Sequence, residues 1–229
     1  MVTKSGLVLT FGCGQAGRLG HGGEEDITYP KVVERLAKTR KAVLSAACGR
    51  EHTLVALSSG QVAGWGWGEG GRLGLGEVGA VLWPEMLLEV DRLGVQAASV
   101  ACGREHSLIV TRCGRVLACG PSDRGRLGLS PGALQGGKGR NGGEAEGRNV
   151  VFPRLLSAGV GSALAGEVVV GASAGEMHTV CMCRSGKVFT WGHGETGALG
   201  HGSPEDEPLP RLVTGVADAA GRDDVRALP

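Results

Sequence analysis

Three histidines recur at equivalent places in the chain, and they are the first residues whose chemistry asks for an explanation. His52, His106 and His178 each stand before a hydroxyl residue in a segment of the pattern G-x-x-H-[ST]. A metal site needs ligands that converge on one point, and a catalytic triad needs an acid and a nucleophile beside the histidine. These histidines belong to separate units, and no such pairing recurs with them. We therefore expect no metal and no catalytic residue, and each histidine to pack between units with a hydrogen bond to the backbone.

A second pattern, G-x-G-x-x-G, occurs at 12–17, 66–71 and 192–197. In a dinucleotide site this pattern joins a strand to a helix, and an acidic residue follows about 20 residues later. Here each copy runs into Leu-Gly-x-Gly, which is a poor start for a helix, and the copies recur in register as structural turns would. We interpret these glycines as turn residues that allow positive φ and tight packing. No cofactor is expected.

Arginines precede Leu-Gly at three places in the chain and are candidate partner-binding residues. Arg18, Arg72 and Arg126 could ring one face of the molecule as a binding surface, or each could lie in solvent and stack on its own loop. Lys138 and Arg140 add a small basic cluster to the candidates. Two glutamates follow this cluster closely, so a nucleic-acid patch is a weak interpretation.

Composition and charge exclude several classes of protein. The 229 residues carry 24 basic and 23 acidic side chains, a formal charge of +1, so nucleic acid or chromatin is not the expected partner. A hydrophobic content of 41% argues against a disordered chain. The seven cysteines are odd in number and form no C-x-x-C pair, which indicates reduced thiols in an intracellular protein, cytoplasmic and/or nuclear. No apolar run has the length of a membrane span or a secretory signal, so we expect no membrane partner.

The elements that position these residues recur with a common period. The glycine-rich turns begin at Phe11, Trp65, Cys119 and Trp191, which are 54, 54 and 72 residues apart. Each recurring histidine precedes the next turn by 13 residues, and a glycine that could form a hairpin turn lies 8 residues after it. Most of the extra length of the third unit falls within 131–148, a glycine-rich segment of mixed charge that we interpret as a surface insertion.

Each unit reads as about four short strands. The segments around His52 and Trp65 bracket Ser59-Gly60 as a β-hairpin, and 42–48 supplies a preceding apolar strand. The stretch after Pro30 is expected to supply another strand. A four-stranded sheet repeated at this period is the blade of a β-propeller, so the predicted fold class is all-β.

The joint spacing of A-C-G-x-x-H-[ST], S-G-x-V-x-x-W-G and G-x-x-G-x-L-G-x-G resembles the regulator of chromosome condensation repeat. The resemblance extends through 1–229 apart from the insertion and the last dozen residues. It implies a seven-bladed β-propeller, which at this period would need roughly 380 residues. The chain holds about four units, so we expect a partial propeller, part of a larger one. An open arc would leave blade faces and strand edges exposed and would favour association.

The resemblance implies two candidate functions. The first is a non-enzymatic protein–protein interaction module, because propeller loops present a rigid surface to other proteins. The alternative is guanine-nucleotide exchange on a Ran-like small GTPase, with the insertion at 131–148 compared to a wedge. No exchange residue can be matched one for one, and no constellation supports a hydrolase or a metal enzyme.

Overall fold

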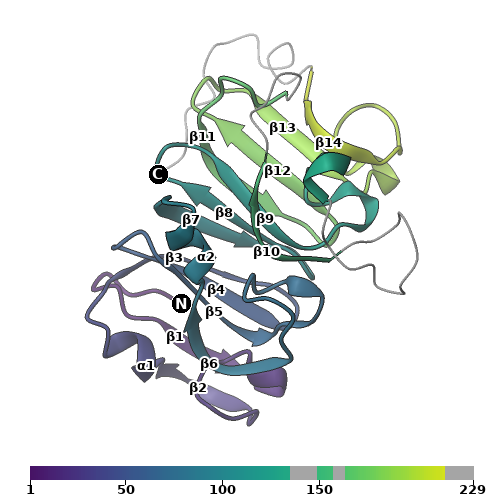
Figure 1. Ribbon diagram of the computed structural model, residues 1–229. Coiled ribbons are helices and arrows are strands. Elements are labelled where there is room, and N and C mark those ends of the chain that lie inside the picture. Colours follow the sequence, from purple (N-terminus) through teal and green to yellow (C-terminus); the bar gives the residue numbers. More distant parts are fainter. Residues whose placement is uncertain (135–148, 157–162, 215–229) are drawn as a thin grey trace.

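The computed structural model describes residues 1–134, 149–156 and 163–214. Within them, four antiparallel sheets follow one another along the chain and lie side by side in chain order (Figure 1). We number these sheets as blades 1 to 4. Each is a simple meander in which strands adjacent in sequence are hydrogen-bonded neighbours.

Blade 1 contains β1 (Leu9–Gly12) and β2 (Ile27–Val32). Blade 2 contains β3 (Val43–Cys48), β4 (His52–Leu57), β5 (Val62–Trp67) and β6 (Ala80–Met86). Blade 3 contains β7 (Ala97–Cys102), β8 (Ser107–Thr111), β9 (Val116–Pro121) and β10 (Asn149–Leu155). Blade 4 contains β11 (Val169–Ala174), β12 (His178–Cys183), β13 (Val188–Gly192) and β14 (Glu207–Leu212).

Helical segments are short and connect the strands. Two α-helices, α1 (Glu34–Ala37) and α2 (Leu88–Arg92), follow β2 and β6. One 3-10 turn lies between the last two strands of each blade: η1 (Gln15–Gly17), η2 (Glu69–Gly71), η3 (Asp123–Gly125) and η5 (Glu195–Gly197). A further turn, η4 (Pro131–Leu134), opens the expected insertion, whose remaining residues lie outside the described part. None of the helices in the described ranges has the length and apolar character of a membrane span.

The all-β propeller class is confirmed, and so is the hairpin at Ser59-Gly60, where Ala56 pairs with Val62. One detail differs from the expectation. The strand near Pro30 does not follow the proline but contains it, and α1 comes next. Proline has no N–H to donate, and β2 is the outer edge of its sheet, where an unpaired position is tolerated.

The hydrophobic core lies between the blades. Consecutive first strands are in contact, β3 with β7 and β7 with β11, while the outer strands β6, β10 and β14 contact the 3-10 turn of the preceding unit. One cluster, which includes Leu54 and Ile109, joins blades 2 and 3, and another, which includes Leu108 and Trp191, joins blades 3 and 4. Every residue of β4 is buried because both faces of blade 2 are covered.

Candidate functional site

The repeated histidines connect neighbouring blades through hydrogen bonds. At two junctions a histidine, a hydroxyl and a main-chain carbonyl form a chain of contacts: His52–Ser107–Arg72 and His106–Thr179–Arg126. In the first, His52 Nε2 lies 2.9 Å from Ser107 Oγ, which donates to the Arg72 carbonyl at 2.7 Å. Because the hydroxyl has one proton and gives it to the carbonyl, the histidine must donate from Nε2. The expected packing between units is confirmed, but the partner is a hydroxyl of the next blade rather than the backbone.

Burial keeps these histidines uncharged. His52 and His106 are fully enclosed, and the Nδ1 atom of each is buried without a hydrogen-bond partner among the described residues. Desolvation, and after it the positive charge of a nearby arginine, lowers the pKa of both to about 3; the arginine is Arg72 for His52 and Arg126 for His106. A histidine whose pKa lies this far below 7 is poorly suited to transfer protons near pH 7. The two histidines therefore hold blades together.

The carbonyls of the arginine turns accept a second bond from the next blade. Trp65 Nε1 donates to the Arg18 carbonyl at 2.9 Å. Gly20, with φ +76°, lies against that indole, and a Cβ there would be 2.8 Å from Trp65 Nε1. The turn therefore needs glycine both for its backbone conformation and for the approach of the ring. The other two junctions place Trp191 and Cys119 at the equivalent position.

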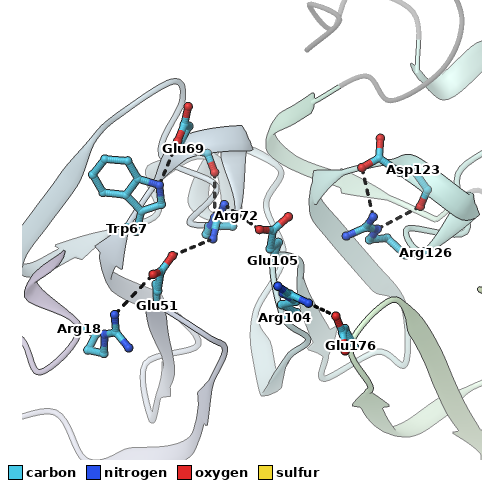
Figure 2. A network of polar contacts seen from close by, with 10 residues as sticks. All are labelled: Arg18, Glu51, Trp67, Glu69, Arg72, Arg104, Glu105, Asp123, Arg126 and Glu176. Atoms are coloured by element: carbon cyan, nitrogen blue, oxygen red, sulfur yellow. Dashed lines mark hydrogen bonds and ion pairs between the residues drawn. The ribbon is translucent and has the colours of Figure 1, made fainter. Parts of the chain in front are cut away.

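The side chains of the arginine turns lie in a row with acidic residues between them (Figure 2). Glu51 bridges two blades, with Oε1 at 3.6 Å from Arg18 Nη2 and Oε2 at 3.8 Å from Arg72 Nη1. Arg72 Nη2 also lies 3.6 Å from Glu105 Oε1. We call Arg18, Glu51, Arg72 and Glu105 the charge ladder. Arg126 pairs with Asp123 of its own turn at 3.1 Å.

The placement of these arginines on an exposed face was wrong for two of the three. Arg72 is 3% exposed and Arg126 is 2% exposed, whereas the Arg18 side chain is about one-fifth exposed. Each folds back on its own turn, as in the donation from Arg72 Nε to the Glu69 carbonyl at 2.8 Å. A buried guanidinium is tolerated only when its charge and donors are satisfied, which explains the acidic partners. Lys138 and Arg140 lie outside the described residues.

The exposed charges of this region sit on the loops that follow the first strands. Arg50, Arg104 and Glu176 occupy equivalent places on three successive loops and are exposed. The loops are joined directly, because the N–H of Arg50 donates to the Arg104 carbonyl at 3.1 Å and the N–H of Arg104 to the Glu176 carbonyl at 3.3 Å. The side chains of Arg104 and Glu176 form an ion pair (Figure 2). We call these three residues the charged rim.

The charged rim borders an open hollow of about 460 Å³, which is lined by the loops after β3, β7 and β11. Sequence reasoning missed it, although a signal was present. The first two units read G-R-E-H and the third reads G-E-M-H, so the third unit carries an acid where the others carry arginine. That exchange is what lets Glu176 pair with Arg104.

Neither the cysteines nor the acids of the described ranges form a group that could hold a metal ion. All seven cysteines are free thiols. Burial raises the pKa of Cys181 to about 12 and that of Cys119 beyond the range of ordinary thiols. Cys113, exposed in the β8–β9 hairpin, has a pKa lowered to about 7 by hydrogen bonds with Thr111 and then Arg115.

Sheets of this kind, repeated with one turn and one histidine loop per unit, define a propeller-repeat protein. The regulator of chromosome condensation (RCC1) repeat model matches residues 5–56, 59–110 and 185–222, and a second model of the same repeat matches 97–126. These matches cover more than half of the chain. The chain therefore belongs to the RCC1-repeat family.

Similar proteins differ in size. The chain is 33% identical over 212 residues to the human E3 ubiquitin-protein ligase HERC2. The matched region covers 93% of the chain and 4% of HERC2. It is also 32% identical over 222 residues to human protein RCC2, and this match covers 93% of the chain and 41% of RCC2. The crystal structure of Prp20p from Saccharomyces cerevisiae matches with a TM-score of 0.73 and 27% identity over 94% of the chain and 48% of Prp20p. The chain thus spans less than half the length of each of these proteins.

Proposed function

We propose that this chain is a non-enzymatic protein-interaction module, a propeller scaffold that binds other proteins through its loops. The charged rim carries the proposal. Its three loops are joined to one another by main-chain hydrogen bonds. The buried histidines and the charge ladder join the blades that carry these loops. Loops fixed in this way lose little conformational entropy when a partner binds. The chain matches proteins as different as HERC2 and RCC2, which fits a binding module that is joined to different proteins.

The rim also indicates the chemistry of the partner. Arg104 is neutralised by Glu176, whereas Arg50 presents an exposed guanidinium at one end of the row. Arg18 Nη1 donates to the Arg50 carbonyl at 3.0 Å and so supports this loop. We propose that Arg50 and the exposed part of Arg18 meet an acidic patch on the partner, and that Lys138 and Arg140 also bind the partner. Arg72 and Arg126 would act by holding the loops in place.

Two broader proposals accompany this function. Residues 131–148 fall between β9 and β10 in sequence and are proposed as a surface insertion in a repeat array that extends through 1–229 and is part of a larger propeller. We also propose an intracellular location, cytoplasmic and/or nuclear. Seven free cysteines support it, since thiols persist in reducing compartments.

The test uses one charge reversal on the rim and one away from it. Arg50→Glu reverses the exposed rim charge, and Arg92→Glu makes the same change on α2, where Arg92 pairs only locally with Glu89. Proteins labelled by proximity in cells would be compared for the wild type and both variants, and each would then be titrated in purified form. We expect some partners to be labelled by the wild type and Arg92→Glu but not by Arg50→Glu. In the titrations, the association rate of Arg50→Glu with such a partner should be about tenfold lower at low salt. Equal partner sets for the wild type and Arg50→Glu would contradict the role of the rim.

A second candidate is nucleotide exchange on a Ran-like small GTPase. The observation that favours it is the similarity to Prp20p, whose structure was reported together with its binding properties to Gsp1p and histones. Fluorescent GDP release from such a GTPase would be measured with the wild type and with a variant that lacks 131–148. Release faster than the intrinsic rate, lost in the variant, would establish exchange. An intrinsic rate in the presence of folded, monodisperse protein would exclude it.

A further inference from the structure

A row of hairpin turns forms the end of the blades opposite to the charged rim. In blade 2, β4 starts at His52, beside the rim, and ends at Leu57, where residues 58–60 turn the chain into β5. In blade 1 an equivalent turn precedes β1, closed by pairing of Val2 with Val8. The turn glycine has positive φ, between +78° and +86°, in all four blades: Gly6, Gly60, Gly114 and Gly186. We call the surface formed by these turns and α2 the hairpin face.

The turns are fixed to the blades that follow them. At each of three junctions the carbonyl of the turn glycine accepts a hydrogen bond from the first strand of the next blade. The bonds run from Val43 to Gly6 at 2.9 Å, from Ala97 to Gly60 at 2.7 Å and from Val169 to Gly114 at 2.9 Å. The hairpin face is therefore a preformed surface that loses little conformational entropy when a partner binds.

Basic residues recur in these turns. The residue two positions before the turn glycine is Lys4, Arg112 or Arg184 in three of the blades. The residue directly after the glycine is Arg115 or Lys187 in two of them. All five side chains are exposed, so the turns present positive charge to solvent.

The turn of blade 2 has no basic residue, but two basic side chains reach it. Arg112 Nη2 donates to the Ser58 carbonyl at 2.7 Å, which brings the guanidinium of blade 3 to this turn. Lys41 Nζ, just before β3, donates to Gln61 Oε1 at 2.5 Å. The row of positive charge therefore continues across blade 2.

Most of this charge is not neutralised within the described ranges. Lys187 pairs with Glu167 at 2.8 Å. The other basic residues of the turns, and Lys41, have no described acid at ion-pair distance. Arg112, for example, donates to the uncharged oxygens of Ser58 and Gln96. The arginines of the charge ladder differ, since glutamates pair with them. The formal charge of +1 is an average over the chain and does not describe the hairpin face.

Apolar side chains are exposed on the same face. Leu88 of α2 is 59% exposed, and Leu93, directly after the helix, is 44% exposed. Leu88 also lines a hollow of about 260 Å³ between α1 and β6, whose apolar lining includes Leu36, Pro84 and Met86. Exposed apolar side chains beside a hollow are typical of a surface that contacts other molecules.

Hydrogen bonds place α2 between two of the basic residues. Gln61, which accepts from Lys41, donates through Nε2 to Asp91 of α2 at 3.1 Å. On the other side, Arg112 Nη1 donates at 2.9 Å to Oε1 of Gln96, which follows α2. The exposed leucines of α2 therefore have positive charge on both sides.

We propose that the hairpin face binds an acidic protein segment that carries apolar side chains. Its carboxylates would pair with the basic residues that have no acidic partner, since guanidinium and carboxylate groups form strong paired hydrogen bonds. Its apolar side chains would cover Leu88 and Leu93. A nucleic-acid strand fits less well, because the leucines offer nothing to its phosphates and the four turns contain no aromatic side chain on which bases could stack. The proposal adds a second binding face, separate from the charged rim.

Panning of random peptides against the full chain tests this partner class. The peptides have about 12 residues and span up to about 40 Å when extended. The panning is done at low salt, where surface charges are least screened. We expect the enriched peptides to combine Asp or Glu with Leu, Ile, Val or Phe. The consensus peptide, labelled with fluorescein, is then titrated by anisotropy. A control peptide with its apolar residues replaced by serine should bind about tenfold more weakly, as loss of one buried leucine predicts.

Charge reversals locate the binding surface. Lys41→Glu and Arg115→Glu change the hairpin face at residues whose side-chain hydrogen bonds stay within their own blade. Arg50→Glu makes the same change at the rim and is the matched control. We expect each hairpin-face variant to bind the peptide about tenfold more weakly at low salt and Arg50→Glu to bind it like the wild type. The rim proposal expects its partners to be lost in Arg50→Glu, so either proposal can fail without the other.

Three results would overturn the proposal. One is panning that enriches peptides without acidic residues, and another is equal peptide affinity for the wild type and both hairpin-face variants. The third concerns phosphate groups, for which a short DNA duplex and vesicles containing phosphatidylserine are titrated in parallel. If either binds more tightly than the peptide, and Lys41→Glu and Arg115→Glu weaken it, the face recognises phosphates rather than an acidic protein. Near-UV circular dichroism checks that each variant is folded, and one folded variant is enough for the comparison.

Discussion

A single backbone conformation recurs in all four glycine-rich turns, at Ala16, Gly70, Arg124 and Thr196. Each has φ between +57° and +73°, yet only the second turn has a glycine at this position. The left-handed region costs an L-residue about 1–2 kcal/mol, and a β-branched side chain is the least suited to it. The turn keeps this conformation because its leucine, Leu199 or the equivalent residue, is buried and anchors it.

Thr196→Gly is therefore expected to stabilise the protein. Glycine adopts φ +61° without strain but loses more backbone entropy on folding, so the gain in the free energy of unfolding is about 1 kcal/mol. Urea unfolding followed by circular dichroism measures it. Gly70→Ala, the reverse change at φ +73°, is the control and should lower the midpoint. A lower midpoint for Thr196→Gly would show that its side chain contributes more than the strain costs.

The enclosed histidines predict a dependence of stability on pH. The folded pKa of His52 and His106 is about 3, below the unfolded value of about 6.5, so the unfolded chain binds more protons between these values. Their contribution to stability is complete above pH 6.5 and falls as the pH drops toward 3. Each histidine steepens the loss by up to about 1.4 kcal/mol per pH unit.

His106→Gln tests this dependence, because it removes the titrating group and keeps a side-chain donor for Thr179. We expect the variant to lose roughly half of the histidine-linked slope of unfolding free energy between pH 6 and pH 4, about 1.4 kcal/mol per unit. Above pH 7 both proteins carry neutral side chains at this position, and their slopes should coincide. An unchanged acid slope in His106→Gln would show that other groups govern acid unfolding.

At the scale of elements, the repeat supplies its own controls. Thr179 and Thr53 stand at equivalent places and both donate to the carbonyl of an arginine turn. Thr179 also accepts from the buried His106, whereas no described histidine stands in that relation to Thr53. The difference between the two positions isolates the histidine bond.

Thr179→Ala is expected to cost more stability than Thr53→Ala. Both lose a methyl group and a hydroxyl donor, but only Thr179→Ala leaves the buried Nε2–H of His106 without an acceptor. An unsatisfied buried donor costs about 1–3 kcal/mol, and the two losses in unfolding free energy should differ by this amount. Denaturant titration of both variants gives the difference. Equal losses would mean that the ring shifts to another acceptor.

The elements themselves could be predicted from sequence because their signals are local. The hairpin at Ser59-Gly60 and the positive φ of Gly20 follow from residue types a few positions apart. The bonds between blades could not be predicted in the same way. His52 lies next to Thr53 in sequence but contacts Ser107, which is 55 residues away. The burial of Arg72 likewise depends on Glu51 and Glu105 from two blades, whose relative placement no local pattern specifies.

At the scale of the whole molecule, stability follows from contacts between adjacent blades. Blade 3 has a complete blade on each side, whereas blade 1 contacts only blade 2 among the described blades. In an array of this kind the stability of a unit is approximately its own contribution plus those of its two interfaces. The central blade should therefore be the last to open.

Native-state hydrogen exchange measures this order directly. The amides of β8 and β9 should exchange slowest, because blade 3 is covered on both faces. Blades 1 and 4 each have one described neighbour, but blade 1 has two strands and blade 4 has four, so β1 and β2 should exchange fastest. Equal protection throughout would instead mean that the arc opens as one cooperative unit, with coupling between blades stronger than the unsupported faces of blades 1 and 4 imply.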